Sequence, residues 1–125
     1  MPMLTPPKKL SVSELSDIET WQGVLREAIE YLKGLGDEIR NLSEATKDIW
    51  EIHFLICQFG DRVDEIRSRI RRLYHHLAHY FLSTGGDIPK SEVATTLEKI
   101  LADINELHQD WMKFLAEKKL GVIFL

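Results

Sequence analysis

Arginine and histidine are concentrated in one stretch of the sequence, R-S-R-I-R-R-L-Y-H-H-L-A-H, from Arg67 to His79. Residues 61–82 contain five arginines and three carboxylates. This segment therefore has a net charge of +2 (5 − 3) in a chain whose formal net charge is -4. Guanidinium groups form forked, charge-assisted hydrogen bonds with phosphate, so this region predicts an anion-facing surface and, as one hypothesis, a nucleic-acid contact. The residues that would share one side of a helix are Arg62, Arg69, Arg72, His76 and His79. The full candidate set for a nucleic-acid or anion contact is Arg62, Arg67, Arg69, Arg71, Arg72, His76 and His79.

A second interpretation gives the same arginines a structural role. The expected first and last helices are acidic, and the last one carries Asp103 and Asp110. The arginines could therefore form ion pairs across the surface of a helical bundle. Charged stripes on helices are usually solvated faces, which favours this second interpretation.

Two pairs of potential metal ligands have the i, i+4 spacing of one helix face: His53 with Cys57, and His75 with His79. Imidazole and thiolate are zinc ligands, and two such pairs could complete a tetrahedral site. A chain turn at Gly60 would not place the pairs opposite each other, so we expect no metal site within one chain. These four residues remain the candidates if a dimer forms.

No catalytic signature is present. The sequence contains no glycine-rich phosphate loop, no nucleophile elbow and no H-E-x-x-H motif. Cys57 lies in an apolar segment, where a thiol is usually unreactive, so we expect it to be a buried packing residue. We therefore predict no catalytic residues and no cofactor.

Four segments with apolar residues at 3-4 spacing predict the helices that position these residues. Glycine-aspartate pairs at 36–37, 60–61 and 86–87 are typical of a helix end followed by a new helix start, and they divide the chain. The expected core of the first segment is Ile18, Trp21, Leu25, Ala28, Leu32 and Leu35, and that of the second is Ile39, Leu42, Thr46, Ile49, His53 and Ile56, widened by Trp50, Ile52 and Phe59. The third has Val63, Ile66, Ile70, Leu73, Leu77 and Tyr80, and the fourth has Val93, Leu97, Ile100, Ile104, Leu107, Trp111 and Phe114.

The fold class is all-α, and the pattern favours an antiparallel four-helix bundle. The apolar phase slips by one residue between Gly60 and Ile66, which fits either a turn or a kink. The alternative is therefore a three-helix arrangement with one long kinked central helix spanning about 37–82, whose exposed seam would require a dimer. Each of Trp21, Trp50 and Trp111 is expected in the core.

Composition sets the broad class. A chain of 125 residues with 44% hydrophobic and 29% charged residues is typical of one folded domain. We expect an extended proline-rich arm at residues 1–12, a helical bundle domain at 13–120 and an apolar tail at 121–125. With one cysteine, no export signal and no membrane-spanning run, the expected location is cytoplasmic, without membrane contact.

Together these patterns predict a non-enzymatic assembly protein: a small subunit of a larger complex, or an adaptor that forms homo-oligomers. Its partner would be another protein or a second copy. The alternatives are a small nucleic-acid-binding subunit that uses the arginine-rich third helix, and a metal-binding bundle.

Overall fold

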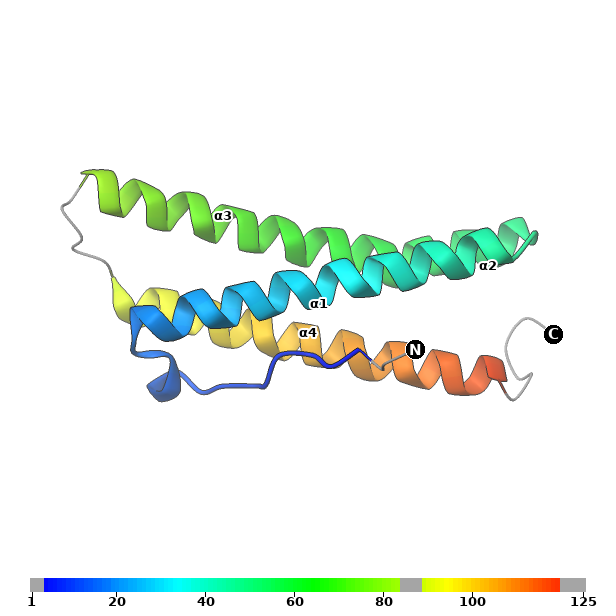
Figure 1. Cartoon of the computed structure of the whole chain (residues 1–125), viewed down its shortest axis with the longest axis horizontal. Coiled ribbons are helices and arrows are strands. Elements are labelled where there is room, and N and C mark those ends of the chain that lie inside the picture. Colours follow the sequence, from blue (N-terminus) through cyan, green and yellow to red (C-terminus); the bar gives the residue numbers. More distant parts are fainter. Residues whose placement is uncertain (1–3, 84–88, 120–125) are drawn as a thin grey trace.

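The computed structural model of the chain describes residues 4–83 and 89–119, and the regular elements in these ranges are all helical, as predicted. They are the 3-10 helix η1 (Ser13–Leu15), α1 (Ile18–Ala45), α2 (Ile49–Leu55), the π-turn η2 (Ile56–Gly60), α3 (Asp61–Ser83) and α4 (Lys90–Lys119). Figure 1 shows an elongated bundle in which α1 and α4 run in one direction and the α2, η2 and α3 segment runs in the opposite direction.

The predicted chain turn at Gly60 is wrong. Leu55 and Asp61, on either side of η2, both have right-handed helical backbone angles, so α2, η2 and α3 form one continuous helix. We call this 49–83 segment the central rod. The predicted four-helix bundle is therefore not confirmed, and within residues 4–83 and 89–119 the alternative three-helix arrangement with a long kinked central helix fits better. The phase slip in the sequence marks a π-turn, in which one turn is widened without ending the helix.

The chain reverses instead at residues 46–48, so the central rod begins at Ile49 and not near 37. Asp48 accepts a hydrogen bond from the backbone N–H of Trp50 at 2.9 Å, and the Thr46 hydroxyl accepts one from the N–H of Asp48 at 3.2 Å. Side-chain caps thus make this turn without glycine or proline. The glycine-aspartate pair at 36–37 lies inside α1, and the pair at 86–87 lies outside the described residues.

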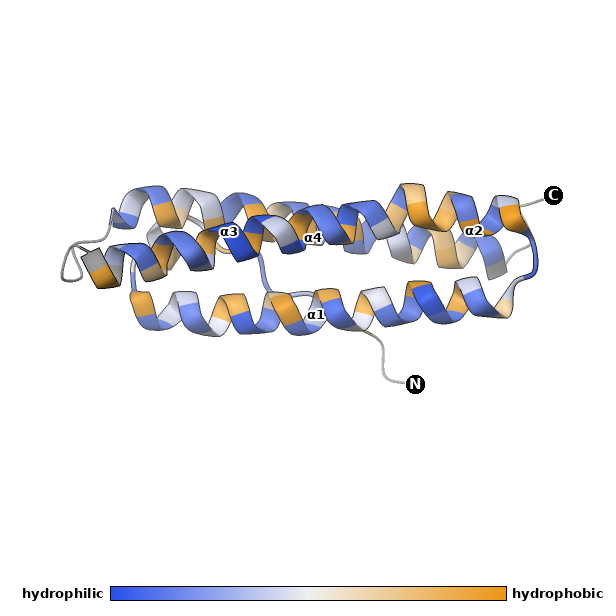
Figure 2. Cartoon of the chain, turned by 90° about the horizontal axis from the view of Figure 1, so that it is seen from above, coloured by the Kyte–Doolittle hydropathy of each residue, from blue (hydrophilic) through white to orange (hydrophobic). Residues whose placement is uncertain are grey.

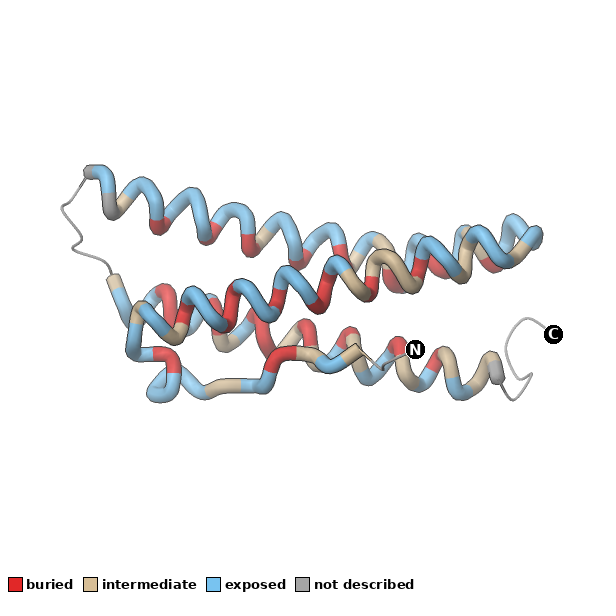
Figure 3. The backbone as a smooth tube through the Cα atoms, in the orientation of Figure 1, coloured by how far each residue is buried: buried red, intermediate tan, exposed pale blue. Residues whose placement is uncertain are grey.

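The core follows three of the four predicted stripes (Figure 3). The expected residues of α1, α3 and α4 are buried, apart from Ile18 and Tyr80 at the stripe ends, which are partly buried. Trp21 and Trp111 are each 1% exposed, as predicted. The second stripe is only partly right: Ile39 and Phe59 are buried, whereas Ile49, Trp50, His53 and Ile56 are exposed. In α2 and η2 the inward residues are Glu51, Leu55 and Phe59.

The N-terminal segment, residues 4–12, lies in the groove between α1 and α4. Pro7 is buried, and its carbonyl accepts a hydrogen bond from the Asn105 side chain at 2.9 Å. The N–H of Val12 donates to the Glu98 carboxylate on α4 at 2.9 Å. Leu4 packs closely on Gly34 of α1, where an added Cβ would meet the end of the leucine side chain at 2.7 Å.

Gly60→Ala is expected to raise the free energy of unfolding by about 0.5–1 kcal/mol, because alanine loses less backbone entropy than glycine in a helix. The nearest atom to an added Cβ is the Leu55 carbonyl oxygen at 3.9 Å, an ordinary contact. Gly23→Ala in α1, where an added Cβ meets nothing within 4 Å, is the matched control and should give a similar gain. Chemical denaturation followed by circular dichroism measures both variants. A loss of stability in Gly60→Ala alone would contradict the continuous helix.

Candidate functional site

One side of α2 and the first part of η2 is apolar and exposed to solvent. Ile49, Trp50 and Ile56 are 75%, 79% and 48% exposed. His53 and Cys57 are also exposed and share this side at helical spacing. We call these five residues the α2 face. Figure 2 shows a dense run of hydrophobic residues around α2.

The α2 face corrects two predictions. Trp50 was expected in the core and is instead one of the most exposed large hydrophobic residues. Cys57 was expected to be a buried packing residue and is exposed, with its Sγ 3.6 Å and 3.9 Å from the two ring nitrogens of His53. Both errors have one cause: the opposite side of α2, which carries Glu51 and Leu55, is the side that packs on the bundle.

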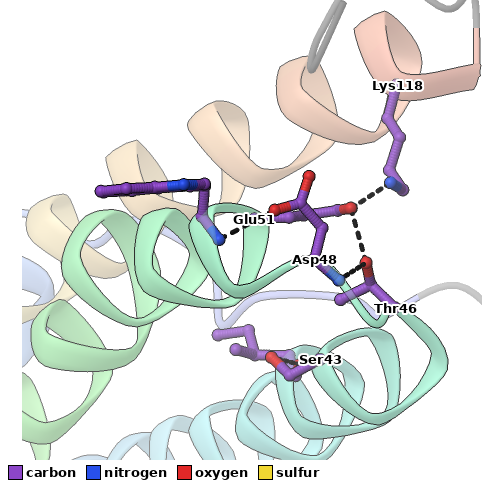
Figure 4. A network of polar contacts seen from close by, with 7 residues as sticks. Ser43, Thr46, Asp48, Glu51 and Lys118 are labelled. Atoms are coloured by element: carbon purple, nitrogen blue, oxygen red, sulfur yellow. Dashed lines mark hydrogen bonds and ion pairs between the residues drawn. The ribbon is translucent and has the colours of Figure 1, made fainter.

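A buried carboxylate holds α2 in this orientation (Figure 4). Glu51 is 6% exposed, accepts a hydrogen bond from the Thr46 hydroxyl at 2.8 Å, and forms an ion pair with Lys118 near the end of α4. An ion pair with low exposure requires good partners on both sides, because burial removes the water that would otherwise solvate the charge. Glu51 therefore links the turn before α2 to the far helix. The sequence pattern did not identify Glu51, because glutamate is usually a surface residue and nothing in the local spacing marks this one as buried.

The full candidate set for an anion contact is divided between two sides of α3, while the predicted stripe of Arg62, Arg69, Arg72, His76 and His79 shares one side. Arg62 forms an ion pair with Asp110 at 3.0 Å, and Arg69 forms one with Asp103 at 2.6 Å. The expected pairing with the acidic last helix is confirmed for these two arginines. Arg72, His76 and His79 are exposed, and His76 makes an edge contact with the ring of Tyr80, with centroids 4.8 Å apart.

Arg67, Arg71 and His75 lie on another side of α3, around an open groove between α3 and α1. The groove has a volume of about 460 Å³. Its other lining residues are Ile29 of α1 and Ile70, Tyr74 and Ala78 of α3. We call it the α1/α3 groove. Within residues 4–83 and 89–119, neither arginine has an ion-pair partner.

The four metal-ligand candidates are not brought together within one chain. Cys57 and His75 are separated along the central rod by 18 residues, or about 27 Å of helix rise. In the part of the chain that the structure describes, no three histidine, cysteine, aspartate or glutamate side chains form a group that could hold a metal ion.

Two side-chain hydrogen bonds join α1 to α4, and one of them links Tyr31 and His108, whose pKa values are both shifted by burial. The Tyr31 hydroxyl and His108 Nδ1 are 2.9 Å apart, and the Trp111 indole N–H donates to Glu38 at 2.8 Å. Burial, with a smaller contribution from the Glu38 charge, raises the pKa of Tyr31. Burial lowers the pKa of His108, and the nearby Glu38 carboxylate opposes this shift only in part. Both groups are therefore held neutral, which suits a structural link between helices.

Comparisons with protein-family models, curated protein sequences and solved structures give no match. Among the described helices, none is both long enough and apolar enough to cross a bilayer. The function must therefore be argued from the surfaces of this chain.

His108 is expected to make stability depend on pH. An unfolded imidazole has a pKa of about 6.5, and the folded-state pKa is lower, so below about pH 6.5 the unfolded chain binds more protons than the folded one. The contribution of neutral His108 is present above that pH and is lost as the pH falls through the folded-state pKa. Urea denaturation between about pH 7.5 and 5.5 should show a shallower fall in unfolding free energy for His108→Gln than for the parent chain. His79→Gln, at an exposed histidine, is the control, and an equal flattening in both variants would contradict this role for His108.

Lys118→Met should lower the free energy of unfolding by about 1–3 kcal/mol, because it leaves the buried Glu51 carboxylate without its cation. The Lys118 side chain is 32% exposed, so water screens part of the loss. Combining Lys118→Met with Glu51→Gln should recover part of the stability, since no buried charge then remains. Thermal and urea denaturation of the three variants tests this, and strictly additive losses would argue against the coupling.

Proposed function

We propose that this chain is a non-enzymatic assembly protein that joins a second copy of itself through the α2 face. The observation that carries the proposal is the 79% exposure of Trp50 beside Ile49, which is 75% exposed, on a helix fixed to the bundle by its opposite side. Single exposed hydrophobic residues are normal on protein surfaces, but a contiguous group is typical of an interaction site. Tryptophan is also among the residues that contribute most to protein interfaces.

The spacing of the α2 face supports a second copy as the occupant. The five positions 49, 50, 53, 56 and 57 are symmetric about His53. In an antiparallel helix pair with a two-fold axis through His53, Trp50 lies against Ile56 of the partner subunit, and Ile49 lies against Cys57 of the partner subunit. A two-fold interface requires such self-complementary spacing.

The charge of the α2 face supports the same occupant. It contains no aspartate, glutamate, lysine or arginine, so two copies can meet without bringing like charges together. Its rigid attachment through Glu51 also lowers the ordering cost of association, because the side chains are already presented on a folded helix.

Trp50→Glu is expected to weaken self-association at least about 30-fold, the effect of losing a contact that contributes about 2 kcal/mol or more. Sedimentation equilibrium between about 1 and 100 µM measures the dissociation constant. Leu82→Glu is the matched control, because Leu82 is 88% exposed at the other end of the central rod and should leave the constant unchanged. A parent chain that stays monomeric over the whole range, or equal effects of the two variants, would overturn the proposal.

Disulfide trapping tests the position of the axis. His53→Cys in a Cys57→Ser background places two cysteines face to face across the proposed axis, so mild oxidation should give a covalent dimer. Gln22→Cys in the same background, on the exposed side of α1, should remain a monomer. Equal cross-linking at the two positions would show non-specific contact.

A nucleic-acid contact, the second function considered, has less support. Arg62 and Arg69 are two of its five arginines, and carboxylates of α4 already neutralise them. Of the remaining arginines, Arg67 and Arg71 lie on a different side of α3, and only Arg72 shares the side of Arg62 and Arg69. The metal-binding function would require residues from two chains.

A further inference from the structure

The three helices of this bundle form three grooves, and this chain itself partly covers one of them and bridges another with ion pairs. The N-terminal segment, residues 4–12, covers the groove between α1 and α4 with Leu4, Pro7 and Leu10. The groove between α3 and α4 is bridged by the Arg62–Asp110 and Arg69–Asp103 ion pairs.

The third groove, between α1 and α3, has neither a covering segment nor a bridging ion pair among the described residues. Ile29 of α1 is 40% exposed and Tyr74 of α3 is 43% exposed, and both line the α1/α3 groove. Figure 1 shows that α3 leans away from α1 toward its C-terminal end, where this groove lies. A smaller hollow of about 320 Å³ continues it toward the start of α3, and Arg67 lines both.

The shape of the α1/α3 groove matches a helix. Its α3 residues run from Arg67 to Ala78 with 3-1-3-1-3 spacing along one face. This face is about 16 Å long, or three turns. The floor is apolar, formed by Ile29, Ile70 and Ala78 with the ring of Tyr74, as in grooves that receive the apolar stripe of an amphipathic helix.

The rim of the groove is cationic. Arg67, Arg71 and His75 contribute titratable or positive groups, and no carboxylate belongs to the lining of the 460 Å³ part. By contrast, the hollow between α3 and α4 contains four carboxylates beside its cations. Because arginine forms forked hydrogen bonds with carboxylates, the rim is complementary to aspartate and glutamate flanking an apolar stripe.

Three other occupants fit less well. A second copy meeting groove to groove would place arginines against arginines. The tail G-V-I-F-L of this chain carries no acidic side chain for the rim. A nucleic-acid backbone could contact the arginines but would leave the apolar floor uncovered.

We propose that the α1/α3 groove binds an acidic amphipathic helix of a partner protein. The partner segment carries apolar residues at i, i+3 or i+4, and i+7 that cover Ile29 and Tyr74, with carboxylates on both flanks that pair with Arg67 and Arg71. The 460 Å³ groove shares no residue with the α2 face, and only the smaller hollow that continues it is lined by Ile56 of that face, so the groove itself is available in monomer and dimer alike.

The probe for the test is a fluorescein-labelled helical peptide of about five turns, with leucines at heptad spacing and glutamates on both flanks. Fluorescence anisotropy should show saturable binding to the full chain below about 100 µM that weakens as salt is added. A peptide with the same leucines and lysine flanks should not bind. Equal binding of the two peptides, or none by the glutamate peptide, would overturn the proposal.

Variants locate the site. Arg67→Glu combined with Arg71→Glu should weaken binding of the glutamate peptide at least about tenfold, and should give the lysine peptide measurable affinity. Arg72→Glu is the matched control, because Arg72 is an exposed arginine of the same helix outside the groove lining. A similar loss in the control would mean that general charge and not the groove governs binding. Circular dichroism confirms that each variant is folded.

Three further measurements separate this proposal from others. Methyl NMR shifts of Ile29 and Ile70 should move on peptide addition, and unmoved shifts would overturn it. Repeating the titration with Trp50→Glu should give unchanged affinity for the peptide. The groove proposal and the self-association proposal can therefore be tested separately. If labelled single-stranded RNA binds with the same Arg67 and Arg71 dependence while the glutamate peptide does not, the groove is a phosphate site and the helix proposal is wrong.

Discussion

The central rod must keep one side turned toward both α1 and α4 over its whole length. Its inward residues Glu51, Leu55, Phe59 and Val63 are each four positions apart. In an ideal α-helix this spacing would rotate the inward side by about 120° over twelve residues. The π-turn η2 widens one turn and absorbs most of that drift, so α2 and α3 can pack on the same neighbours. The exposed position of Trp50 follows from this, because Trp50 lies about 140° around the helix from the inward residue Leu55.

The sequence predicted the helices whose apolar residues keep regular 3-4 spacing. The cores of α1, α3 and α4 follow from that spacing alone, since it places each stripe on one face. The same spacing did not predict the buried side of α2, because apolar residues occupy both sides of that helix. Only the packing of α2 on α1 and α4 decides which side is buried. The sequence pattern also misplaced the turn. Glycine at 36 and 60 suggested breaks, whereas the caps at Thr46 and Asp48 make the actual one.

The candidate surfaces were partly predictable for a similar reason. The abundance of arginine in α3 and of carboxylates in α4 predicted ion pairs, and Arg62 and Arg69 form them. Which arginines pair depends on the register of α3 against α4, a long-range property that local spacing does not contain. The α1/α3 groove depends in addition on the N-terminal segment lying on the other side of α1. Had that segment occupied the α1/α3 groove, Ile29 and Tyr74 would be covered.

The geometry of the central rod also relates the two proposed surfaces to each other. In an antiparallel α2 pair the two rods point in opposite directions, and Arg67 lies 14 residues beyond His53, or about 21 Å along each rod. The two α1/α3 grooves would then begin on opposite sides of the dimer axis, about 40 Å apart. A partner with two acidic helices joined by a linker of that reach would bind the dimer more tightly than the monomer through effective concentration alone. Self-association and helix binding would thus be coupled without any change in the shape of either surface.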